Sequence, residues 1–197
     1  IGAETTLTDV MNHPLTPEPL RTAVSQMAAP ALRNLGTLAG NIGNASPAGD
    51  AICTLIALDA ELVLSSLSGM RLVSVEQFIL GPGKTVLRDD EIITEIQITV
   101  KDGRTSWYRK VGTRRANALS KLSVAGDWSV TDNRVDSIRI SLGAVAPVVL
   151  RIRTIEDMIA GMTREEVSKA ADELAAHYGE YIRPIDDQRS TSAYRKG

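Results

Sequence analysis

Alternating apolar residues between positions 107 and 142 constrain the fold of this chain more than any other feature of its sequence. In the central stretch they stand at every second position: Leu122, Val124, Gly126, Trp128 and Val130. This period is that of a β-strand with one buried face. Similar stretches cover residues 107–111 and 138–142, and Asp132-Asn133 between the second and third is typical of a hairpin turn. The pattern predicts a meander of three antiparallel strands.

Helices are expected on both sides of this meander. Pro17-Glu18-Pro19 is typical of a helix start, and the apolar residues that follow it recur with a helical period up to Pro30: Leu20, Ala23, Val24 and Met27. Residues 51–60 predict a buried helix, although a short apolar run of this kind leaves a strand open. Near the end, Thr163 and Glu166 form a capping box. The helical stripe after it, before Gly179, consists of Val167, Ala170, Ala171, Leu174 and Tyr178.

The middle of the chain predicts a second, smaller set of strands. Residues 61–66 and 70–75 form a candidate hairpin around Ser68-Gly69, and residues 81–83 form a loop. Ile96, Ile98 and Val100 alternate as the inward face of another strand. Lys101-Asp102-Gly103 is the best candidate for a domain boundary. We therefore expect an α+β protein with domains over residues 1–101 and 102–197.

Composition and charge exclude several classes of protein. Lys and Arg total 22 against 24 Asp and Glu, a net charge of −2, which argues against a general binder of nucleic acid. No apolar run reaches the roughly 18 residues of a membrane span. Cys53 alone cannot hold an iron–sulfur cluster or zinc, and His13 and His177 are far apart, so no metal site is expected. The start at Ile1 resembles no secretory signal. We expect a cytoplasmic chain whose beginning has been removed.

The segment Arg33–Asp50, RNLGTLAGNIGNASPAGD, carries the chemistry. Its glycines allow a backbone to approach a ligand closely, and their N–H groups suit a phosphate. The spacing matches neither the dinucleotide-binding fingerprint nor a P-loop. Composition alone leaves two interpretations open, a ligand-binding segment and an ordinary loop. A hydrolase is disfavoured because no Ser–His–Asp, Cys–His or metal constellation is visible.

This segment resembles the signature R-N-x-x-T-x-G-G-N-x-x-x-[AG]-S-P-x-x-D of the FAD-binding subunits and domains of molybdenum hydroxylases. That family includes xanthine, carbon monoxide and nicotinate dehydrogenases. Further matches follow in family order along the whole chain: Ile1-Gly2-Ala3 with Thr6, residues 55–61, 83–85 and 90–92, and Asp187, Arg189, Thr191, Tyr194 and Arg195.

The resemblance implies the second lobe of a PCMH-type FAD-binding domain, followed by a C-terminal domain like that of CO dehydrogenase flavoproteins, with a three-stranded antiparallel sheet and helices. Carried over by position, the cofactor-binding residues are Thr37, Leu38, Ala39, Gly40, Asn41, Asn44, Ser46, Asp50, Ile93 and Lys110. The first five would lie beside the diphosphate and isoalloxazine of FAD, and Ile93 would pack near its adenine end. A cation such as Lys110 near the flavin would stabilise charge developing on reduction; without the family, a strand lysine facing water is the ordinary case.

Two departures from the family pattern stand out. Ala39 replaces the first of the paired glycines, which is harmless if its φ is negative but crowds a phosphate if the position needs a positive φ. The upstream lobe of the family, with its glycine-rich diphosphate loop, is not matched by anything before Ile1. We expect weak FAD binding from half of the cradle alone, because few contacts must offset the immobilisation of a large ligand.

The implied function is electron transfer, with no catalytic acid or base on this chain. Partner subunits would hold the molybdopterin cofactor and the 2Fe–2S clusters, and FAD would pass electrons to NAD⁺ or another acceptor. The alternative is a structural or docking subunit that has lost its flavin. Cys53 is expected in the core, Arg114 and Arg115 at a solvated strand end or subunit contact, and Arg189 and Tyr194 in contacts that fix the tail.

Overall fold

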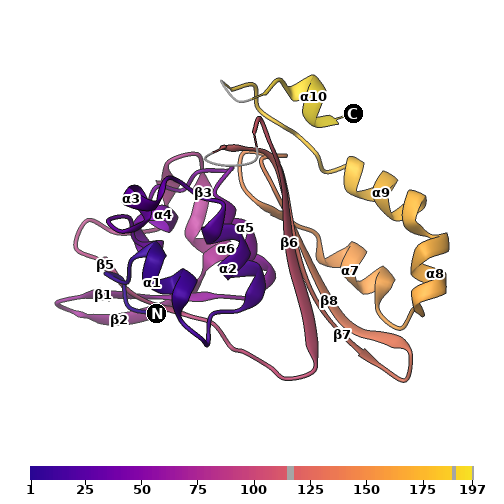
Figure 1. Cartoon of the computed structure of the whole chain (residues 1–197), viewed down its shortest axis with the longest axis horizontal. Coiled ribbons are helices and arrows are strands. Elements are labelled where there is room, and N and C mark those ends of the chain that lie inside the picture. The colour runs from indigo at the N-terminus through magenta and orange to yellow at the C-terminus, as the bar shows by residue number, and fades with distance from the viewer. Residues whose placement is uncertain (115–117, 188–189, 197) are drawn as a thin grey trace.

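A computed structural model describes residues 1–114, 118–187 and 190–196 of the chain. Arg115 and Arg189, singled out from the sequence, lie outside these residues. Within them, a tall antiparallel sheet stands between two groups of helices (Figure 1). The expected α+β class is therefore confirmed.

Helices of the described residues 1–60 form the first group: α1 (Leu7–Asn12), α2 (Glu18–Ser25), α3 (Pro30–Arg33), α4 (Leu38–Gly43) and α5 (Asp50–Ala57). Helix α2 begins at the predicted prolines, and its apolar stripe is buried. Every residue of α5 is buried, which explains why its sequence has no polar face and confirms a helix there. Cys53 within it is fully buried, as expected. Helix α1, capped by Thr6 and Asp9, was not expected.

The smaller sheet has the strand order β2-β1-β5, all antiparallel. Strands β1 (Glu61–Ser66) and β2 (Gly69–Ser74) confirm the predicted hairpin. After them come α6 (Val75–Phe78), the two-stranded pair β3 (Ile79–Gly81) and β4 (Lys84–Thr85), and β5 (Ile92–Gln97). The expected strand face through Ile98 and Val100 was wrong. The chain leaves the sheet after Gln97, and Val100 is 66% exposed just before a turn in which Gly103 adopts a φ of +76°.

The larger sheet has the order β6-β7-β8-β9. Its long strands β6 (Arg104–Gly112), β7 (Ser120–Thr131) and β8 (Arg134–Gly143) confirm the predicted meander. Asp132 and Asn133 turn between β7 and β8 with φ values of +49° and +62°, the conformation that a tight hairpin requires. The short strand β9 (Leu150–Arg151) was not expected, because two residues carry no periodic signal.

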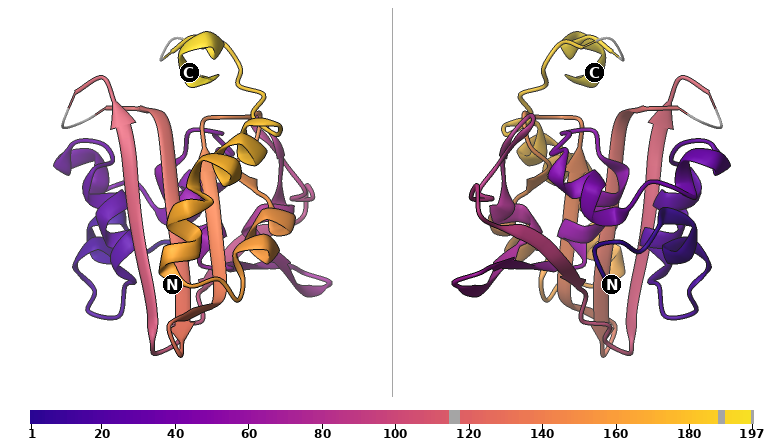
Figure 2. Two further views of the ribbon diagram at one scale, coloured as in Figure 1. Left: turned by 90° about the vertical axis from the view of Figure 1, so that its right-hand side faces the viewer. Right: turned by 90° about the vertical axis from the view of Figure 1, so that its left-hand side faces the viewer.

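Helices cover both faces of this larger sheet, as the two views in Figure 2 show. Helices α2 and α5 pack on one face. The other face carries α7 (Arg153–Ile159), α8 (Arg164–Lys169) and α9 (Ala171–Gly179). The predicted capping box is present at Thr163, but the single expected tail helix is divided at Ala170. Helix α10 (Ser192–Lys196) ends the described chain.

Two searches over the described residues bear on function. No helix among them combines the length and apolar character needed to cross a bilayer. Likewise, no group of three or more His, Cys, Asp or Glu side chains in this part of the chain is arranged to hold a metal ion.

Candidate functional site

The glycine-punctuated segment contains a short helix, α4, so it is more than a loop. Thr37 is the N-cap of this helix, and its Oγ1 accepts a hydrogen bond from the backbone N–H of Gly40 at 3.0 Å. A Cβ on Gly40 would lie 3.0 Å from the same oxygen. The cap therefore leaves little room for a side chain at position 40, which explains the second glycine of the signature.

Ala39 fits its position without backbone strain. It lies inside α4 and is not among the described residues with positive φ. Its side chain packs into the main hydrophobic core with 8% exposure, whereas Gly40 beside it is exposed. The methyl group that distinguishes this chain from the signature thus points inward, and the harmless alternative holds.

Asn41 carries an unsatisfied polar atom in the middle of the segment. Its Oδ1 is buried and has no hydrogen-bond partner among the described residues. Such an unpaired acceptor costs about 1–3 kcal/mol. The residue as a whole is half-buried. A ligand that bonds to Oδ1 would therefore displace no hydrogen bond of this atom within the described chain. A ligand that donates an N–H or O–H would restore the missing interaction.

The turn after α4 connects the segment to its surroundings. Asn44 is exposed at the C-cap of α4. The carbonyl of Ser46 accepts from Gly49 N at 2.9 Å, and its hydroxyl accepts from Ala48 N at 3.4 Å. The carbonyl of Ala45 accepts from Gly83 N at 3.1 Å, which joins this turn to the β3–β4 hairpin. The exposed side of the segment is therefore held in place by backbone contacts.

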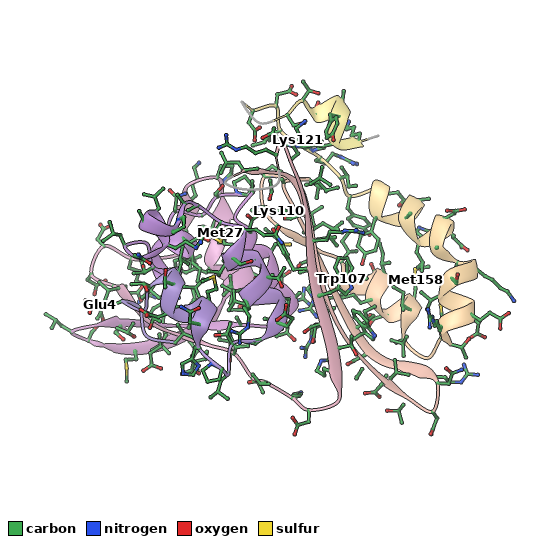
Figure 3. All side chains as sticks on the ribbon, viewed as in Figure 1. Glu4, Met27, Trp107, Lys110, Lys121 and Met158 are labelled. Carbon is green, nitrogen blue, oxygen red and sulfur yellow. The ribbon has the colours of Figure 1, made fainter. Side chains whose placement is uncertain are left out.

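Asp50 and Lys110 form a buried ion pair rather than an exposed surface. Lys110 Nζ lies 2.7 Å from Asp50 Oδ2, and the two side chains are 5% and 6% exposed. The ammonium also donates to the carbonyls of Gln26 and Ala118, both at 3.0 Å. Its three protons thus each have an acceptor within the chain. Figure 3 shows Lys110 on the side of the sheet that faces α2 and α5. In this arrangement Lys110 fixes the start of α5, directly after the signature.

Polar side chains that sequence reasoning missed surround this pair. Ser120, fully buried, donates its hydroxyl proton to Asp50 Oδ1. Burial and the nearby charge of Asp50 raise the pKa of Tyr108 above its ordinary value, and its hydroxyl has no partner among the described residues. Burial raises the pKa of Cys53 to about 11. In the sequence, Ser120 could be noticed only as a serine at a core-facing position of a strand, and this does not reveal that it bonds to Asp50.

The remaining predicted residues have separate places. Leu38 is fully buried in the core, and Ile93 on β5 is half-buried against the same core; β5 contacts α4. The structure thus brings Thr37–Asp50 and Ile93 into one half of the molecule, and Lys110 joins them through Asp50. Arg33, also in the signature, donates to the carbonyls of Met27 and Ala28 at 2.8 and 2.7 Å, so it fixes the turn after α2.

The hydrogen bonds that fix the tail come from Arg195, and the expected Tyr194 adds a contact with Lys121. Arg195 donates to the carbonyls of Lys121 and Ile185 at 3.0 and 2.6 Å, and it pairs with Asp187 at 2.9 Å. Tyr194 is 54% exposed, with Lys121 Nζ 4.3 Å from the ring centroid. Arg114 is exposed just beyond β6, at the strand end where it was expected.

Comparisons with known proteins place this architecture in a defined class. Residues 1–100 match the family described as the FAD binding domain in molybdopterin dehydrogenase. Residues 107–197 match the CO dehydrogenase flavoprotein C-terminal domain. The boundary at residues 101 and 102 itself stays a prediction.

Individual relatives agree along the whole chain. The glyceraldehyde dehydrogenase medium chain of Sulfolobus acidocaldarius is 31% identical, over 100% of this chain and 70% of its own length. The carbon monoxide dehydrogenase medium chain of Hydrogenophaga pseudoflava is 30% identical, over 99% and 68%. A solved carbon monoxide dehydrogenase structure from that organism superposes with a TM-score of 0.88 at 30% identity, covering 100% of this chain and 69% of the other.

The fold and the matched regions define an FAD-binding oxidoreductase subunit. More particularly, the chain belongs to the family of FAD-binding subunits of the molybdenum hydroxylases. Its segment fits such a cofactor chemically. Thr37, Asn41 and Ser46 are half-buried and Asn44 is exposed, and Asn41 Oδ1 lacks a donor.

Proposed function

We propose that this chain binds FAD along the exposed side of α4 and the turn after it, and that it acts as the electron-transfer subunit of a molybdenum hydroxylase. The observation that supports this most directly is the unpaired Oδ1 of Asn41, within the region that matches the FAD-binding family. A buried acceptor without a donor is rare in folded proteins. A ligand with N–H and O–H donors accounts for it.

Most of the predicted residues then have a task that their positions allow, although for Asp50, Lys110 and Ile93 this task is structural and replaces the cofactor contact that the resemblance implied. The hydroxyl of Thr37 holds the start of α4, so that the exposed backbone at Gly40 can approach a diphosphate. The side chains of Asn41, Asn44 and Ser46 supply hydrogen bonds to polar groups. Asp50 and Lys110 hold the end of the segment in place, and Ile93 supports the core beneath it. FAD supplies the two-electron chemistry when it is bound.

The proposed electron path runs from 2Fe–2S clusters on a small subunit, through FAD, to NAD⁺ or another acceptor. A large subunit would hold the molybdenum cofactor. The relatives named as medium chains support this division of labour. Cys53, the single cysteine of the chain, is buried in α5 and is not positioned to ligate a cluster. The cytoplasmic location expected from the sequence stays a prediction.

Replacement of Asn41 tests the flavin site directly. Asn41→Leu removes the acceptor at similar size, and we expect FAD affinity to fall about tenfold. The measurement is the visible absorbance of flavin that stays with the subunit, purified with its partner subunits, across a series of FAD concentrations. Asn12→Leu, at the exposed end of α1, is the matched control and should bind as the parent does. Equal retention by the two variants would contradict the proposal.

The alternative, a docking subunit without flavin, predicts a colourless subunit that still assembles with its partners. Its support from the sequence was Ala39 and the unmatched upstream lobe, and the inward position of the Ala39 methyl group removes the first of these. To identify the acceptor, NAD⁺ is added to the reduced complex without oxygen. If the bleached, reduced flavin regains its colour, NAD⁺ is the acceptor. If it stays bleached, the acceptor is another compound.

A further inference from the structure

A groove lies on the opposite face of the larger sheet from Asp50 and Lys110. It has a volume of about 590 Å³ and is lined by strands β6–β8 and by residues of α7 and α8. This volume is in the range of small-molecule sites. In Figure 3, Trp107 marks this face, on the side of α7 and Met158. The proposed flavin site does not involve it.

The floor of the groove is a glycine flanked by two indole rings. Gly126 on β7 is the cross-strand partner of Trp107 on β6, and Trp128 follows two residues later on the same face. A Cβ on Gly126 would lie 3.2 Å from Trp107 Nε1 and 3.7 Å from Trp128 Cζ3. Both rings therefore reach over a position that has no side chain. Such a floor suits a flat aromatic ring, which can stack or meet the indoles edge to face.

Aliphatic side chains complete the lining beside the tryptophans, and the groove remains open to solvent. Ile138 and Ile140 of β8 and Val167 of α8 line it. Trp107 is 40% exposed and Val130 is 52% exposed. The helices on this face thus leave the apolar side chains near strand β6 uncovered.

An exposed positive charge, without an ion pair or hydrogen bond among the described residues, joins these apolar groups in the lining. Arg164, at the start of α8, lines the groove. Among the described residues it has no ion pair or hydrogen bond. The nearby Glu166 instead accepts from Thr163 N at 2.7 Å and lies 3.5 Å from Arg134. Asn133, in the β7–β8 turn, adds an exposed amide to the lining. A guanidinium with free donors recognises a carboxylate with two parallel hydrogen bonds.

We propose that this groove binds a small planar aromatic carboxylate, with its ring against the indoles of Trp107 and Trp128 and its carboxylate on Arg164. The positive charge of Arg164 favours a carboxylate at one end of the ligand. The two indoles beside Gly126 favour a flat aromatic ring at the other end.

The two tryptophans of the chain make the test specific, because both line the groove. The full chain is labelled with ¹⁵N and titrated with 2-naphthoate, and the two indole N–H signals are followed by NMR. We expect both signals to shift and to saturate together. The uncharged 2-naphthamide, of the same shape, should bind about tenfold more weakly.

Variants separate the charge from the apolar surface. Arg164→Gln should weaken naphthoate binding about tenfold and leave naphthamide binding unchanged. Lys84→Gln removes an exposed charge on β4, outside the groove, and should change neither. Gly126→Ala places a methyl group against Trp107 and should weaken both probes.

Three outcomes would overturn the proposal. The first is the absence of any saturable shift with naphthoate. The second is equal binding of naphthoate and naphthamide in the parent. The third is a shift of the indole signals with protein concentration alone, which would show that a second copy covers the groove. None of these outcomes depends on FAD binding, so failure here and failure of the proposed function are distinguishable.

Discussion

At the scale of single residues, positions 39 and 40 differ in which way a side chain would point. Ala39 turns its methyl group into the core, and Gly40 faces solvent beside the Thr37 cap. Adjacent helical residues project about 100° apart, so one position can be buried while the next lies at the surface. The two glycines of the signature are therefore explained separately. In this chain position 40 must lack a side chain, whereas position 39 accepts a methyl group.

Restoring the first glycine should weaken the fold without improving cofactor binding. Ala39→Gly removes a buried methyl group and a good helix former, so we expect a loss of about 1 to 2 kcal/mol in urea unfolding. Ala175→Gly, at an exposed position of α9, should lose only the propensity part, about 1 kcal/mol. FAD affinity should stay at the parent value. A rise in FAD affinity for Ala39→Gly would show that the methyl group crowds the cofactor after all.

At the scale of elements, the sequence predicted long patterns better than short ones. The meander of β6, β7 and β8 followed from strict alternation, and α2 followed from its prolines and stripe. Helix α4 could not be predicted, because its stability comes from the Thr37 cap and from burial of Leu38 and Ile42 rather than from helix formers. Asp50 and Lys110 were each predicted as site residues, but their pairing depends on a tertiary contact between positions 60 residues apart.

Strand β2 is tied to the segment before β5 by one carboxylate. Arg71 donates from Nε and Nη2 to Glu91 at 2.7 and 2.9 Å, and Arg88 N donates to it at 3.0 Å. The Arg71 guanidinium therefore lowers the pKa of Glu91 from 4.5 to about 2. This contact joins the edge strand of the smaller sheet to residues 86–91.

The depressed pKa predicts how the fold responds to acid. Above pH 4.5 the carboxylate is ionised in the folded and unfolded chain, and its stabilising effect is fully present. As the pH falls from 4.5 toward 2, the unfolded chain binds the proton first, so stability is lost across this interval. Urea midpoints measured at several pH values should fall less steeply for Glu91→Gln than for the parent. Glu165→Gln, an exposed control, should follow the parent, and parallel curves for all three would contradict this assignment.

At the scale of the whole molecule, two sets of charged groups among the described residues join the helical half to the larger sheet. One is the Asp50–Lys110 pair. The other is an alternating series in which Asp59, in the turn between α5 and β1, pairs with Arg139 and Arg151. The series extends to further partners on both sides: Arg104 and Asp127 at 2.6 Å, Arg139 and Asp127 at 3.0 Å, Arg139 and Asp59 at 2.7 Å, and Arg151 and Glu156 at 2.9 Å. Both places connect residues of the two regions that match separate families.

Breaking the Asp50–Lys110 pair should loosen this connection. Lys110→Met leaves Asp50 buried without its cation, and we expect a loss of about 3 to 5 kcal/mol in urea unfolding. The double variant Asp50→Asn/Lys110→Met should lose less than the two single variants together, because the charges then leave as a pair. Lys169→Met breaks only an exposed helix pair with Glu165 and should cost about 0.5 kcal/mol. A loss for Lys110→Met no larger than that of Lys169→Met would refute the buried pair.

The position of Cys53 has a practical consequence. Its thiol is enclosed by α5 and the larger sheet and stays protonated at neutral pH, and alkylating reagents require an accessible thiolate. A cysteine engineered on the solvent side of α4 would therefore be the sole site open to a maleimide dye or spin label. A label for distance measurements can thus be attached beside the signature segment without first replacing Cys53.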